Sequence, residues 1–116
     1  MLMRVAAAAL LVAVAAIPLR AHHGWGSYDA AKLITVKGNI LDAKYENPHV
    51  TLKVQAPEKT WTVTLAPTSR MINRGALKEM VAVGKTISAD GYPSKTEKDE
   101  LRAERIAVDG KTIEMR

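Results

Sequence analysis

HVTLKVQAPEKTWTVTL, residues 49–65, decides the fold of this chain. Apolar and polar residues alternate in it on both sides of a short loop at residues 56–59. A period of two is typical of a strand that buries one face, so we predict a β-hairpin over this stretch. The inward-facing residues are expected to be Val50, Leu52, Val54, Trp61, Val63 and Leu65.

Further strands are predicted on either side of this hairpin. Residues 33–45 are rich in β-branched side chains, and Gly38 in their middle indicates a bulge or a tight bend. Asp109-Gly110 is the strongest turn signal in the chain and predicts a last short strand at residues 112–115. The other long strands are expected at residues 85–92 and 101–108.

Residues 68–80 interrupt the strands with a helical pattern. Thr68 or Ser69 can cap a short helix after Pro67, and Gly75 is expected to end its first turns in a left-handed conformation. Three strands, a helical segment and two strands, the second extended by a hairpin, predict a mainly β fold. The expected architecture is a small five-stranded OB-like barrel with a short helical segment between strands three and four, and a β-sandwich is the alternative.

The chain begins with a secretory signal pattern. A basic start with Arg4 is followed by an apolar run at residues 5–17, then Pro18, and Ala21 supplies the small residue at the expected cut. The run is shorter than the roughly 20 residues that a membrane-spanning helix needs. We therefore expect a cleaved signal peptide at residues 1–21, no transmembrane segment after processing, and a periplasmic or secreted protein. The processed chain divides into an N-terminal arm, 22–32, and an OB-like barrel domain, 33–116.

The composition narrows the function classes. Cys is absent, so disulfides and thiolate sites are excluded. The 17 basic residues, less Arg4 and Arg20, against 12 acidic ones give the processed chain a charge of +3. Export and the dispersed placement of the basic residues argue against nucleic acid as a partner.

Several segments resemble a known family. They are HHGWGSYD (22–29), YENPHVTLKV (45–54), TWTVTLAPTSR (60–70), GYP (91–93) and ELRAERIAVDGKTIEMR (100–116). Together they are similar to a family of small exported bacterial proteins, domain of unknown function 6152, over essentially the whole processed chain. The resemblance implies an envelope location and a small β-barrel, with no established activity.

The histidines predict a metal site. After a cut at Ala21, His22 offers its α-amine and its imidazole as a chelate, and His49 follows a turn on the polar face of its strand. If the arm folds back, these two residues supply three nitrogens, a donor set that suits Cu(II). His23 is the candidate fourth donor. The bland alternative is a solvated terminus and a surface histidine at a turn.

Other residues are expected to support this site. Trp25 can pin the arm to the barrel, although core filling is about equally expected for it. Asp29 or Glu46 can fix the tautomer of a ligand histidine, and Asn47 belongs to the turn that precedes His49.

No catalytic constellation is recognised, so we do not expect an enzyme. The first functional hypothesis is binding or carriage of copper, with an envelope protein or a metal-delivery partner. The second is a metal-free envelope module that uses a barrel face to bind a peptide, a glycan or a protein. The arginines at positions 70, 74, 102 and 105 could bind an acidic partner, but the favoured expectation is a solvated, salt-bridged surface.

Overall fold

The computed structural model describes residues 24–116. The predicted signal peptide, His22 and His23 lie outside these residues. The strands form one sheet in the order β3-β2-β1-β4-β5-β6, and β3 also pairs in parallel with β5, which closes a five-stranded barrel. The strands are β1 (Ile34–Lys44), β2 (Thr51–Gln55), β3 (Thr60–Thr64), β4 (Thr86–Pro93), β5 (Glu100–Val108) and β6 (Lys111–Glu114).

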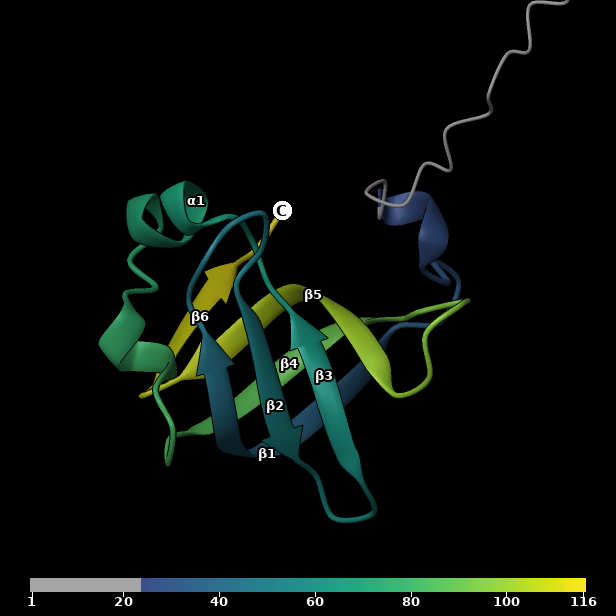
Figure 1. Cartoon of the computed structure of the whole chain (residues 1–116), viewed down its shortest axis with the longest axis horizontal. Coiled ribbons are helices and arrows are strands. Elements are labelled where there is room, and N and C mark those ends of the chain that lie inside the picture. Colours follow the sequence, from purple (N-terminus) through teal and green to yellow (C-terminus); the bar gives the residue numbers. More distant parts are fainter. Residues whose placement is uncertain (1–23) are drawn as a thin grey trace, which may run out of the picture.

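The helical segments flank this barrel (Figure 1). α1 (Thr68–Asn73) and the 3-10 helix η2 (Lys78–Val81) connect β3 to β4, and a second 3-10 helix, η1 (Trp25–Ser27), precedes β1. The expected OB-like barrel with a short helix between strands three and four is therefore confirmed over the sandwich. The extra strand, β6, extends the sheet beside β5.

The core follows the alternation of the sequence. Val50, Leu52 and Val54 are buried, as are Val63 and Leu65 opposite them. Trp61 is only partly buried and packs against the edge of this cluster. β2 begins at Thr51 rather than at residue 49, although the backbone of Val50 still pairs with the segment after β3. His49 thus lies just before the strand.

Gly38 has a different role from the one expected. The register shift in β1 lies between Ile40 and Asp42. At Gly38 an added Cβ would come 1.8 Å from the carbonyl oxygen of Gln55. The glycine is therefore needed for a close approach of β2, and the bulge comes three residues later.

The turns are mostly as predicted. Asp109 and Gly110 both have positive φ, and so does Gly75 after α1. The predicted cap of α1 by Thr68 or Ser69 is wrong, because Pro67 is the N-cap residue. Asn47 supplies the capping oxygen from another loop: its Oδ1 accepts hydrogen bonds from the Thr68 amide and hydroxyl, each at 3.0 Å.

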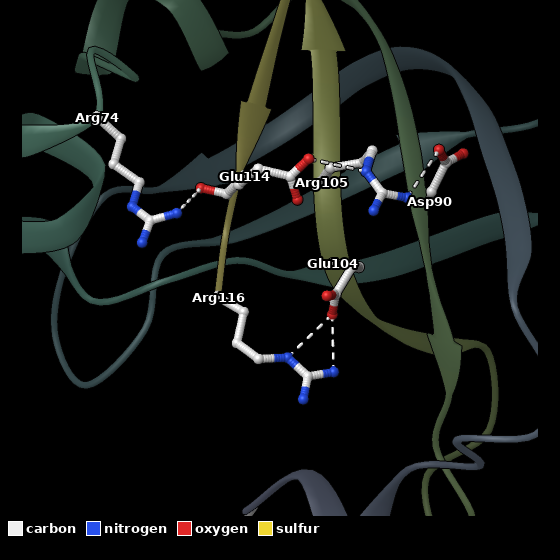
Figure 2. A network of polar contacts seen from close by, with 6 residues as sticks. All are labelled: Arg74, Asp90, Glu104, Arg105, Glu114 and Arg116. Atoms are coloured by element: carbon white, nitrogen blue, oxygen red, sulfur yellow. Dashed lines mark hydrogen bonds and ion pairs between the residues drawn. The ribbon is translucent and has the colours of Figure 1, made fainter.

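A line of charges crosses the outer face of β4, β5 and β6 (Figure 2). Asp90 lies 3.8 Å from Arg105, whose Nε donates to Glu114 at 3.0 Å. Arg74 donates to the Glu114 carbonyl at 3.1 Å. Unlike charges alternate along this line, which ties the strand edge of β6 to α1. We call Asp90, Arg105 and Glu114 the charge ladder.

Candidate functional site

The N-terminal arm docks on the loop between β4 and β5. The Lys95 amide donates to the Ser27 carbonyl at 2.9 Å, and the Asp29 amide donates to the Pro93 carbonyl at 2.9 Å. Tyr28 forms an isolated bridge with Ser94. These backbone bonds hold residues 24–29 at one end of the barrel.

Trp25 is the side chain that fastens the arm. The guanidinium of Arg102 lies 4.2 Å from the centroid of its ring, and that of Arg116 lies 4.0 Å from it. Tyr92 meets the same ring edge-on, with centroids 6.1 Å apart. Trp25 is thus held between the arm and the barrel by cation–π attraction and an aromatic edge contact.

Arg102 is buried at the centre of these contacts, with 7% of its surface exposed. Its Nη2 lies 3.3 Å from Nε2 of His49, and because a guanidinium only donates, this ring nitrogen accepts. Burial lowers the pKa of Arg102, and the positive charges of Arg70 and Arg116 lower it further. The expectation of a solvated Arg102 is therefore wrong: the residue faces outward from β5, but the arm covers it.

Tyr28 and Glu100 form a second buried contact below the arm. The Tyr28 hydroxyl donates to Oε1 of Glu100 at 3.2 Å, and the Thr64 hydroxyl donates to the same oxygen at 2.9 Å. Burial, and then the charge of Glu100, raise the pKa of Tyr28 to about 12. This tyrosine therefore stays protonated at ordinary pH and fixes the carboxylate at the wall of the barrel.

Two surface depressions meet beside His49 and share Lys44 and Thr51. We call them together the polar groove. The first, of about 180 Å³, crosses the outer face of β1, β2 and β3. The second, of about 320 Å³, continues past the turn before β2 to the start of β5. The polar and charged residues that line the groove include Asp42, Lys44, Glu46, His49, Thr51, Lys53, Thr62 and Glu100, and Tyr28 also lines it.

The predicted supporting residues separate in space. Glu46 and Asn47 line the groove beside His49, and the side-chain Oδ1 of Asn47 also caps α1. Asp29 accepts a hydrogen bond from the Ala31 amide at 3.2 Å within the arm. Over residues 24–116 no three His, Cys, Asp or Glu side chains gather closely enough to hold a metal ion. The predicted copper site therefore depends on His22 and His23, and its test lies outside the part of the chain described.

Sequence reasoning missed two features of this end of the barrel. One is the 3-10 helix η1, because three residues are too few to show a periodic pattern. The other is the convergence of Arg102 and Arg116 on Trp25, residues far apart in the sequence. An arginine at an outward position of a strand looks solvated unless one knows that the arm folds over it.

Comparison with known proteins gives a family and no activity. A family model described as a family of unknown function (DUF6152) matches residues 8–102, most of the chain. None of the curated proteins matches.

Helices long and apolar enough to cross a membrane are not found among residues 24–116.

Proposed function

The chain belongs to the DUF6152 family of unknown function, and we propose that it is an exported binding module whose polar groove takes an extended segment of a partner protein. The observation that carries the proposal is the continuity of the two depressions across β1, β2 and β3. In barrels of this type, the face of strands two and three and the adjoining loops form the usual ligand surface. Export follows from the signal pattern at residues 1–21.

The lining of the groove favours a peptide over other polymers. Asp42, Glu46 and Glu100 place carboxylates along it, and these repel a phosphate backbone. Sugars and single-stranded bases bind largely by stacking on aromatic rings, but the tyrosine in the lining, Tyr28, is 3% exposed. Lys44 and Lys53 lie among these carboxylates, which suits a segment that carries both charges.

Peptide selection tests this proposal. Random peptides displayed on phage and selected on the protein should bind the wild type and lose binding to Thr51→Trp, which fills the groove where its two parts meet. Thr112→Trp is the matched control, because Thr112 is an exposed strand threonine on β6, away from the groove. Peptides that bind both variants equally, or a selection that yields none, would contradict the proposal.

Copper binding is the second candidate, and one observation favours it. Arg102 contacts both the Trp25 ring and His49 Nε2. Trp25 of the docked arm and His49 therefore lie on either side of one guanidinium group. A chain spans at most about 3.6 Å per residue, and the three residues back to His22 can cover roughly 11 Å. On this second candidate, we propose the amine and imidazole of His22 as the donors that join His49, with His23 as a further donor.

The same contact places copper second. The Arg102 guanidinium contacts Nε2 of His49, and two unit charges 4 Å apart repel by about 4 kcal/mol at an effective dielectric constant of 20. Copper binding through this nitrogen thus requires Arg102 to turn away. Titration of the processed protein, beginning at His22, followed by Cu(II) EPR should give a one-to-one, nitrogen-rich site that His49→Ala loses. Affinity no better than that of an unstructured histidine peptide would end this candidate.

A further inference from the structure

Three arginines converge at the docked arm. Arg70 on α1 donates from Nη1 to the Met115 carbonyl at 3.2 Å, and Arg116 is the next residue along the chain. The guanidiniums of Arg116 and Arg102 both lie about 4 Å from the Trp25 ring centroid. We call Arg70, Arg102 and Arg116 the arginine cluster.

Two members of this cluster keep donors to offer. A guanidinium carries five N–H groups. Within residues 24–116, one hydrogen bond engages Arg70, and two bonds to Glu104 Oε2, at 3.1 and 2.8 Å, engage Arg116. The Arg116 side chain is about half exposed, at 51%. A ligand can therefore approach Arg116 from solvent, and Arg70 next to it is partly exposed.

Like charges that converge repel one another, and a bound anion would offset this repulsion. The charges of Arg70 and Arg116 both lower the pKa of Arg102, which is the direction expected for mutual repulsion. Planar guanidiniums match the oxygens of carboxylates and phosphates in charge and geometry. A divalent cation at the same place would add to the repulsion.

We propose that the arginine cluster binds an oxyanion, a carboxylate or a phosphate, through Arg70 and Arg116. His49 joins the cluster to the polar groove, because it lines the groove and contacts Arg102. This inference rests on the proposed function: the oxyanion belongs to the partner segment that lies in the groove. The partner is then a segment with an acidic group at the end that reaches His49.

NMR of the protein with its arm tests the inference. Inorganic phosphate and acetate are titrated separately, and the indole N–H signals of Trp25 and Trp61 are followed. We expect a saturable shift of the Trp25 signal and none for Trp61. Trp61 lies near the start of β3, whereas Thr64 at the end of β3 pairs with Arg102. Saturation by acetate alone assigns the site to a carboxylate, and saturation by phosphate assigns it to a phosphate group.

α1 supplies a matched pair of variants. Arg70 in α1 and Arg74, its C-cap residue, donate to the carbonyls of Met115 and Glu114 at and just after the end of β6, but Arg74 lies outside the cluster. Arg70→Gln should weaken oxyanion binding about tenfold, the loss expected for one charge-assisted hydrogen bond. Arg74→Gln should leave it unchanged.

Two results would overturn the inference: no saturable shift with either anion, or equal weakening by both variants. Thermal unfolding of the two variants shows that each is folded at the titration temperature. The outcome is separable from that of the proposed function. If selected peptides depend on Thr51 but no oxyanion binds, the proposed groove stands and the oxyanion site fails. If an oxyanion binds but no such peptides are found, only the oxyanion site stands.

Discussion

The charge ladder on β4, β5 and β6 and the arginine cluster at the arm use the same residue types in opposite ways. In the ladder, Arg105 lies between two carboxylates, those of Asp90 and Glu114, and each charge meets its opposite (Figure 2). In the cluster, the like charges of Arg70, Arg102 and Arg116 converge. Arg102 is buried, and Arg116 also pairs with Glu104 at 2.8 Å.

The difference indicates that the ladder holds a strand in place, whereas the cluster is suited to bind a ligand. Alternating charges on an exposed face are nearly satisfied by themselves and contribute little to stability. Like charges brought together by three separate segments are not satisfied by one another. Their arrangement makes sense when an aromatic ring and an anion complete it.

The largest effect is expected from Arg102→Ala. The change removes the guanidinium from the Trp25 ring and from His49, and it leaves space beneath the arm. We expect a loss of about 3 kcal/mol in the free energy of unfolding, through lost packing as well as lost cation–π contact. Urea denaturation measures it. A loss no larger than that of Arg105→Gln would remove the distinction between cluster and ladder.

The next effect depends on pH. The pKa of Tyr28 in the folded state, about 12, lies above the ordinary 10.0, so the folded protein keeps a proton that the unfolded chain releases. Stability from this group is therefore complete below pH 10 and falls as the pH rises toward about 12, by about 2 kcal/mol in all.

Tyr28→Phe should flatten this part of the stability profile. The variant also loses the bond to Glu100, so it is weaker at neutral pH, and its difference from the wild type should narrow above pH 10. The pKa of Tyr45 is raised as well, but that group is present in both proteins and cancels. A constant difference across the range would mean that Tyr28 does not titrate as described.

Trp25→Ala should have a smaller effect on stability, about 1–2 kcal/mol, because it removes an edge contact and two cation–π contacts from the arm alone. Hydrogen exchange should become faster at the Lys95 and Asp29 amides, which bond the arm to the β4–β5 loop. Trp25→Phe, which keeps a ring, is the control. Unchanged exchange at both amides would show that the arm docks without Trp25.

The smallest effect is expected from Arg105→Gln in the charge ladder. Its partners are exposed, and screening shortens the reach of their charges to about 3 Å in 1 M salt. We expect a small loss of stability at low salt, and this loss should vanish in 1 M salt. A loss that survives high salt would place Arg105 among the residues that the fold requires.

Most of the barrel could be predicted from the sequence because its signals are local. Alternation at residues 49–65 identifies the hairpin and its buried residues, and Asp109-Gly110 locates the last turn. Gly38 shows the limit. A mid-strand glycine indicates either a bulge or a close approach, and only the register with Gln55 decides between them.

The candidate site was only partly predictable because it is assembled from distant segments. His49 and Trp25 were singled out, and a third residue, Arg102, joins them. Its burial depends on where the arm docks, which no local pattern encodes. Asn47 lines the groove beside His49, and its Oδ1 also caps α1 through a contact that spans 21 positions and that no local pattern encodes.

Photo-crosslinking in living cells tests the central claim, that the polar groove holds a partner segment. A benzophenone amino acid replaces Thr62 in the groove or, as the control, Thr112 on β6. We expect a discrete crosslinked partner from position 62 and none from position 112. The adduct should map to a segment of the partner that carries an acidic group. No adduct from position 62, or the same adducts from both positions, would contradict it.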